Sequence, residues 1–83
     1  MSKITKAIVW SKPMCPYCDM AKSLLKQKEI EYEERKIGEG WTKEQLLEAV
    51  PGVRSVPQIL LDDKLIGGYD QLKEYFKQGE HNA

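Results

Sequence analysis

The chain is poor in the side chains that build metal centres and covalent frameworks. Its 83 residues include two cysteines and one histidine, His81, which lies close to the C-terminus. A tetrahedral zinc site takes four ligands of this kind, so we expect no metal site.

An excess of charge and long apolar runs are also missing. The 13 basic and 13 acidic residues balance, so no overall field attracts nucleic acid or an anionic membrane surface. No apolar run approaches the length of a signal-peptide core or a membrane span. Repeats and linker-like tracts are absent from the sequence. We therefore expect one cytoplasmic domain over residues 1–83, with a frayed tail at 79–83, that binds neither nucleic acid nor membrane.

The two cysteines stand together in Cys15-Pro16-Tyr17-Cys18. An apolar run at 7–10 precedes them and apolar residues at helical spacing follow over 19–28, which predicts a helix N-terminus at the pair. Unpaired N–H groups and the helix dipole stabilise a thiolate there, and such cysteines have pKa values lowered from about 8.5 to roughly 3.5–7.5. In a cytosolic chain this pair is more typical of catalysis or metal binding than of a structural disulfide. Cys15 is the predicted nucleophile, and Cys18, one turn later and less exposed, can attack a mixed disulfide on Cys15.

The remaining sequence alternates between strands and helices. Strands are predicted at 6–10, 30–36, 57–61 and 65–67, with an Asp62-Asp63 turn between the last two. Three helices are predicted: 16–28, a second that starts at a Thr42 and Gln45 capping box and ends near Val50, and a third that Asp70 caps.

Each predicted helix has an apolar face. The side chains expected to face the core are Cys18, Ala21, Leu24 and Leu25 in the first helix, Leu46, Leu47 and Val50 in the second, and Leu72, Tyr75 and Phe76 in the third. Trp10 and Trp41 are interpreted as packing or rim residues, and the glutamates at 31, 33 and 34 as a solvated face.

Three segments together resemble the active-site segments of dithiol glutaredoxins, as found in phages and bacteria, in the same order and at family spacing. They are Lys12-Pro13-Met14-Cys15-Pro16-Tyr17-Cys18, Arg54-Ser55-Val56-Pro57-Gln58 and Gly67-Gly68-Tyr69-Asp70. The resemblance covers nearly the whole chain. It implies a thioredoxin-like α/β fold in which a four-stranded mixed sheet is flanked by three helices.

The resemblance also implies an activity. Members of this family are glutathione-dependent thiol-disulfide oxidoreductases with a reactive thiolate, here Cys15, and a resolving thiol, here Cys18. Glutathione would be a co-substrate and no cofactor would be tightly bound. Expected partners are glutathionylated or disulfide-bonded proteins, with a ribonucleotide reductase as one electron acceptor by family analogy, and the chain is expected to be a monomer.

Family positions further imply a glutathione groove formed by Lys12, Tyr17, Val56, Pro57, Gly68, Tyr69 and Asp70. The Lys12 ammonium would attract the glycine carboxylate of glutathione and favour the thiolate. Val56 would pair through its backbone with the cysteinyl portion, and Pro57 would be a cis-proline. Gly68, Tyr69 and Asp70 would hold the γ-glutamyl end, while Tyr17 would shield the site.

Departures from the family pattern occur at three positions. Ser55 stands where threonine is common, Tyr69 where cysteine is frequent, and Gln71 where many relatives have a second aspartate. The last removes a charge for the γ-glutamyl ammonium, so Asp70 would supply it alone. Arg54 is a further candidate for a glutathione carboxylate, or a solvated surface residue.

Two alternatives stay open. One is a glutaredoxin-like electron donor reduced by thioredoxin reductase, which the segment at 67–70 argues against because such relatives usually lack it. The other is a glutathione-ligated iron-sulfur carrier, a binding module rather than an enzyme. Pro16 stiffens the loop and disfavours that second reading.

Overall fold

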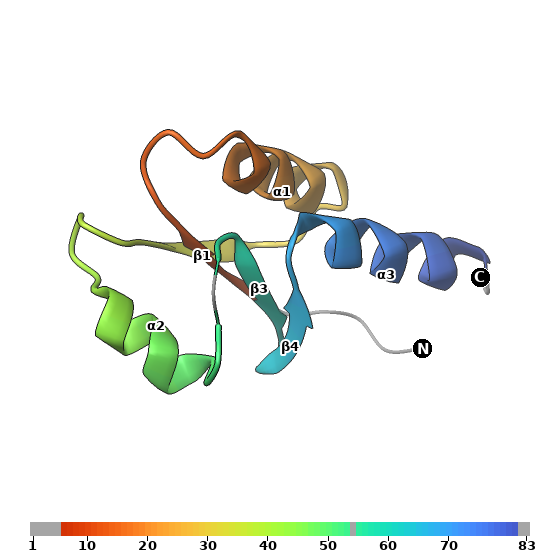
Figure 1. Ribbon diagram of the computed structural model, residues 1–83. Coiled ribbons are helices and arrows are strands. Elements are labelled where there is room, and N and C mark those ends of the chain that lie inside the picture. The colour runs from red at the N-terminus through yellow and green to blue at the C-terminus, as the bar shows by residue number, and fades with distance from the viewer. Residues whose placement is uncertain (1–5, 54, 82–83) are drawn as a thin grey trace.

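A computed structural model describes residues 6–53 and 55–81, with one mixed sheet at its centre. The strands are β1 (Ala7–Ser11), β2 (Tyr32–Lys36), β3 (Gln58–Leu61) and β4 (Lys64–Gly67). Their order is β2-β1-β3-β4, with β1 and β2 parallel and the other neighbours antiparallel (Figure 1). The predicted four-stranded mixed sheet is confirmed.

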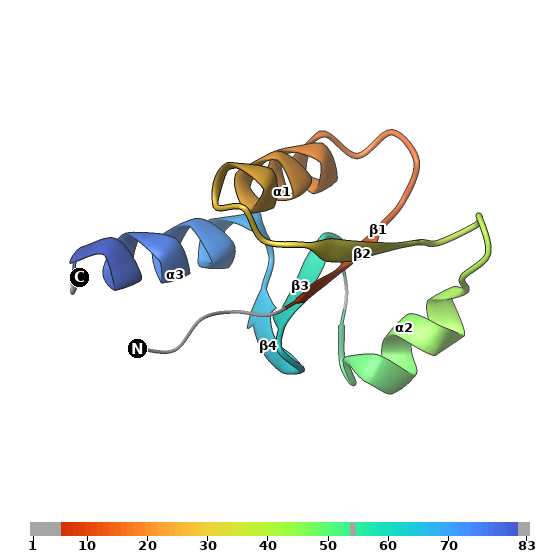
Figure 2. The same ribbon diagram turned by 180° about the vertical axis from the view of Figure 1, so that it is seen from behind.

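Three helices cover the two faces of the sheet: α1 (Pro16–Gln27), α2 (Lys43–Ala49) and α3 (Tyr69–His81). Helices α1 and α3 lie side by side on one face, whereas α2 lies on the other (Figures 1 and 2). No helix in these described segments is long and apolar enough to cross a membrane.

The main core lies between the sheet and the α1/α3 layer. Helix α1 contributes Ala21 and Leu25, and α3 contributes Leu72, all with no exposed surface. They pack against central strand residues, which are Ala7, Val9, Ile59 and Leu61. Because β1 and β3 are the two inner strands, this packing anchors α1 to the most buried part of the sheet.

A second apolar cluster lies under α2. Trp10, Leu46 and Val50 are buried there. The Trp41 ring meets Trp10 edge to face at 5.4 Å, and the Arg35 guanidinium lies 4.4 Å from the Trp41 ring centroid. The predicted capping box is confirmed, since Thr42 Oγ1 accepts from the Gln45 backbone N–H at 3.1 Å and Gln45 Oε1 accepts from that of Thr42 at 2.8 Å.

Three predictions about the helices differ from the structure. Leu47 is 39% exposed, because it follows buried Leu46 by about 100° around the helix and so turns away from the sheet. Tyr75 is 40% exposed, and its ring contacts that of Phe76 in an edge-to-face arrangement. Leu72 occupies the core position. Helix α3 continues to His81, so residues 79–81 of the predicted frayed tail are helical, and residues 82–83 of that prediction lie outside the described residues.

Replacing Leu46 with Ala should therefore destabilise the fold far more than replacing Leu47. Leu46 is 3% exposed and packs with Trp10 and Val50, so its truncation should cost about 2–5 kcal/mol. Leu47→Ala should stay within about 0.5 kcal/mol of the parent. Urea unfolding of both variants measures the difference, and equal losses would contradict the burial assigned to α2.

Candidate active site

The two cysteines occupy the first turn of α1, as predicted. Cys15 is the N-cap residue, with an extended backbone, and Pro16 begins the helix. The Sγ atom of Cys15 accepts a hydrogen bond from the backbone N–H of Cys18 at 3.2 Å. The two residues form a disulfide. One sulfur of the pair is therefore held directly at the positive end of the helix.

The two sulfur-bearing residues differ in exposure. Cys18 is 1% exposed and is buried against the sheet, whereas Cys15 is 8% exposed and closer to solvent. An incoming thiol or disulfide therefore reaches Cys15 more readily. Both the helix position and the access favour Cys15 as the attacking thiolate after reduction.

A hollow of 290 Å³ next to the dithiol turn gathers most of the remaining candidate residues. Its lining is Tyr17, Ser55, Val56, Pro57, Gly68, Tyr69, Asp70 and Gln71. The Val56–Pro57 peptide bond is cis, as the resemblance implied. Lys12 is exposed on the loop after β1 and is not part of this lining. Arg54 lies outside the described residues.

Tyr17 connects the dithiol turn with this hollow. It lies between the two cysteines in sequence, is 59% exposed, and its ring centroid is 6.2 Å from that of Tyr69. Lys73 Nζ lies 5.6 Å from the Tyr69 ring centroid. The two rings thus form an aromatic wall on the dithiol side of the hollow, with a cation behind it.

The predicted role of Asp70 as a helix cap is wrong. Helix α3 begins one residue earlier, at Tyr69, and Gly68 occupies the cap position, since its carbonyl accepts from the Leu72 N–H at 3.0 Å. The Gly68 N–H donates to Gln71 Oε1 at 3.0 Å. Gln71 therefore performs the backward half of a capping box, and the exposed Asp70 lies free of that task in the first turn.

Gly68 is restricted by this arrangement. A Cβ atom on Gly68 would lie 3.2 Å from Gln71 Oε1 and 3.5 Å from the carbonyl oxygen of Pro57. The Gln71 side chain and the Pro57 carbonyl thus both lie close to Gly68. A glycine at this position lets the two approach each other at the edge of the hollow.

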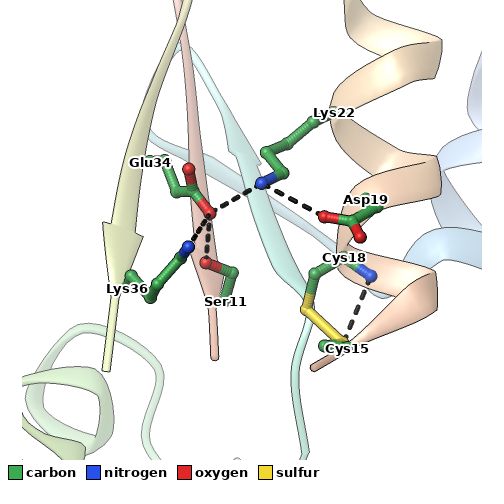
Figure 3. Close-up of polar contacts among 7 residues, drawn as sticks. All are labelled: Ser11, Cys15, Cys18, Asp19, Lys22, Glu34 and Lys36. Carbon is green, nitrogen blue, oxygen red and sulfur yellow. Dashed lines mark hydrogen bonds and ion pairs between the residues drawn. A yellow bond between two sulfur atoms is a disulfide. The ribbon is translucent and has the colours of Figure 1, made fainter. Parts of the chain in front are cut away.

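A group of charged side chains lies beside the dithiol on the inner face of α1 (Figure 3). Glu34 of β2 accepts from the buried Ser11 hydroxyl at 2.7 Å and from Lys22 Nζ at 2.8 Å. Lys22 Nζ also lies 3.3 Å from Asp19, and Lys36 Nζ lies 4.0 Å from Glu34. Sequence reasoning missed this group because it assigned Glu34 to a solvated face. The signal that could have found it is strand alternation, which places Glu34 on the same side of β2 as Tyr32, toward the core.

The partners of this ion pair shift each other's protonation. Burial acts to raise the pKa of Glu34, but the hydrogen bonds from Lys22 and Ser11 and the nearby positive charges hold it below its usual value. The hydrogen bond with Glu34 raises the pKa of Lys22 and outweighs the opposing effect of burial. Both residues are therefore charged at neutral pH.

Gln71→Ala should destabilise the fold by about 0.5–2 kcal/mol, because the Gly68 N–H loses its acceptor at the start of α3. Gln71→Glu should restore stability, since glutamate caps in the same way. Asp70→Asn is the control and should change stability by less than Gln71→Ala does. Urea unfolding measures all three, and a larger effect at Asp70 than at Gln71 would return the capping role to Asp70.

The Glu34 ion pair should make stability depend on pH. A carboxylate with a lowered folded pKa contributes stability that is present above its unfolded pKa of about 4.3 and is lost as the pH falls through the folded pKa. Glu34→Gln should therefore be less stable than the parent at pH 7 and should lose less stability between pH 5 and pH 3. Glu31→Gln, an exposed glutamate nearby, is the control. Parallel pH profiles for Glu34→Gln and the parent would contradict the pair's contribution.

Comparison with known proteins identifies the family. A sequence model of the family described as Glutaredoxin matches residues 7–66. Glutaredoxin 1 of Rickettsia conorii is 38% identical over 74 residues, which cover 87% of this chain and 72% of the relative. Glutaredoxin-C4 of Arabidopsis thaliana is 34% identical over 80 residues, covering 90% of this chain, which spans 58% of that longer relative.

A solved structure agrees with these sequence matches. The buckwheat glutaredoxin-glutathione complex aligns with a TM-score of 0.74 and 31% identity over 88% of this chain and 69% of that one. The family match includes the dithiol turn and the Val56–Pro57 bond, and the fold is shared. This chain belongs to the glutaredoxin family of thiol-disulfide oxidoreductases.

Proposed function

We propose that this chain reduces protein-glutathione mixed disulfides and protein disulfides, with glutathione as its co-substrate. The observation that carries the proposal is the position of Cys15 at the N-cap of α1, with its Sγ accepting the Cys18 N–H, beside a hollow lined by Val56, Pro57 and Gly68. A nucleophilic sulfur and a place for a small peptide thiol thus lie together. The buckwheat relative, solved as a glutathione complex, supports the same choice of co-substrate.

The reaction follows from the two sulfurs. The Cys15 thiolate attacks the glutathione sulfur of a mixed disulfide, the protein thiolate leaves and takes up a proton, and Cys15 carries the glutathione. A second glutathione thiolate attacks that sulfur, which releases glutathione disulfide and returns the Cys15 thiolate. With a protein disulfide, Cys15 forms the mixed disulfide and Cys18 resolves it, leaving the Cys15–Cys18 disulfide. Two glutathione molecules then reduce that disulfide.

Glutathione would lie across the hollow with its sulfur toward Cys15. Among the described residues no hydrogen bond engages the backbone of Val56, so its N–H and C=O can pair with the cysteinyl portion as an added strand would. Asp70 is exposed and its neighbour Gln71 is engaged by Gly68. Asp70 is therefore the acidic group we assign to the γ-glutamyl ammonium. Lys12, outside the lining, would attract the glycine carboxylate at longer range.

We further propose where and on what the chain acts. Met14 is 98% exposed and Met20 42% exposed, and with Tyr17 they give the surface around Cys15 an apolar character suited to protein substrates. A ribonucleotide reductase is one such substrate by family analogy. The reducing conditions that a reactive dithiol requires favour the cytoplasm, and we propose that the chain acts there as a monomer.

Serine substitutions separate the roles of the two thiols. Cys15→Ser should abolish every activity, whereas Cys18→Ser should keep the reduction of a glutathionylated peptide and lose most reduction of a protein disulfide. The measurement is peptide deglutathionylation coupled to glutathione reductase, beside insulin disulfide reduction. Equal loss in both variants on the glutathionylated peptide would overturn the assignment. Faster turnover with thioredoxin reductase as the electron source than with glutathione would overturn the assignment of glutathione as the co-substrate.

A further inference from the structure

The ion pair between α1 and β2 lies where it can act on the dithiol. Lys22 follows Cys18 by four residues, so the two side chains are neighbours one turn apart on the same helix face. Ser11, which donates to Glu34, is fully buried, as is Cys18. Figure 3 shows Ser11, Lys22 and Glu34 gathered on the sheet side of the Cys15–Cys18 turn.

Partial burial of the Lys22–Glu34 ion pair strengthens its electrostatic effect on the neighbouring dithiol. The side chains of Lys22 and Glu34 are 18% and 25% exposed, so water screens them less than it screens surface charges. Lys22 alone would add a positive charge beside the helix N-terminus that already stabilises the Cys15 thiolate. Glu34 cancels that charge at a contact of 2.8 Å. The pair therefore contributes to the net charge near the sulfurs, together with the exposed Asp19, 3.3 Å from Lys22 Nζ, and Lys36, 4.0 Å from Glu34.

We propose that Glu34 and Lys22 together tune the redox equilibrium of the dithiol, with Glu34 limiting the thiolate stabilisation that Lys22 provides. The proposal rests on the glutathione-dependent function above. The equilibrium is the reaction of the Cys15–Cys18 disulfide with two glutathione molecules to give the Cys15 thiolate, the Cys18 thiol, glutathione disulfide and one proton. Two electrons pass from the glutathione sulfurs to the protein disulfide. Only the reduced protein carries the thiolate charge, so a local charge shifts this balance.

Other charged groups surround the thiolate and remain constant in the test. Lys12 precedes it on the loop, and Asp19 lies one residue after Cys18 on α1. Lys36 of β2 lies 4.0 Å from Glu34, and Asp70 of α3 lines the neighbouring hollow. None of them is changed by the substitutions at Lys22 and Glu34, so each single variant at the pair differs from the parent by one unit charge and the double variant keeps the parent's net charge.

The experiment removes each charge separately. Glu34→Gln leaves Lys22 without its main partner and should lower the pKa of Cys15 by about 0.5 to 1, as expected for one nearby charge at an effective dielectric constant of about 20 or more. Lys22→Gln should raise that pKa by a similar amount. The double variant Lys22→Gln with Glu34→Gln should return close to the parent. The pH dependence of Cys15 alkylation by iodoacetamide measures these values without any enzyme assay.

Equilibration in glutathione buffers supplies the second readout. Glu34→Gln should raise the equilibrium constant for reduction of the disulfide about three- to tenfold, where tenfold equals about 30 mV. Lys22→Gln should lower it. Glu33→Gln is the matched control, because it removes the same charge from the next residue of β2, whose partner Arg35 stacks on Trp41 on the opposite face of the sheet.

Several outcomes would overturn the proposal. They are shifts of the same sign in Glu34→Gln and Lys22→Gln, an equally large shift in Glu33→Gln, or an unchanged pKa of Cys15 in variants that are only less stable. If Glu34→Gln does not fold, Lys22→Gln and the double variant still test the sign. A parent that does not equilibrate with glutathione but shows the expected alkylation shifts would refute the co-substrate and leave the tuning intact.

Discussion

The burial of one face of α1 determines most of what this site can do. Ala21 and Leu25 have no exposed surface and dock against the inner strands, and Cys18 continues the same buried row toward the helix start. Once that row is fixed, the N-cap residue one turn before must lie at the end of β1. Cys15 occupies that position, so its sulfur receives the Cys18 N–H and remains at the edge of solvent. The reactivity of the thiol is thus a consequence of core packing.

Alternation along β2 divides its charges between the two faces of the sheet. Glu33 bonds Arg35, whose guanidinium lies over Trp10 and Trp41 beneath α2. Glu34 points the other way and meets Lys22 on α1. The same short strand therefore closes the aromatic cluster on one side and places a carboxylate near the dithiol on the other. A strand rich in charged residues can serve two layers because each face sees only every second residue.

The sequence was sufficient wherever the determining interactions are local. The helix start at Cys15 and the Thr42 capping box were predicted because each depends on residues three or four apart. Resemblance to a family supplied the cis-proline and the hollow, since residues as far apart as Tyr17 and Asp70 have no local signal that joins them. Leu47 was misplaced because it adjoins Leu46 in a helix whose buried face is defined by Leu46 and Val50, which pack on Trp10.

The features that the sequence did not predict depend on tertiary partners or on a shift of one residue in where a helix begins. No residue near Glu34 in the sequence indicates that Lys22 is its partner. The packing of α1 on the sheet brings Lys22 Nζ to 2.8 Å from the Glu34 carboxylate. At α3, starting the helix at Tyr69 instead of after Asp70 exchanges the roles of two neighbours. The glutamine that departs from the family pattern is then used as a cap, and the aspartate is released toward the hollow. Gln71, which stands where many relatives have an aspartate, is used to cap α3, and Asp70 is not needed for that cap. Asp70 therefore supplies the one carboxylate available at the far end of the hollow.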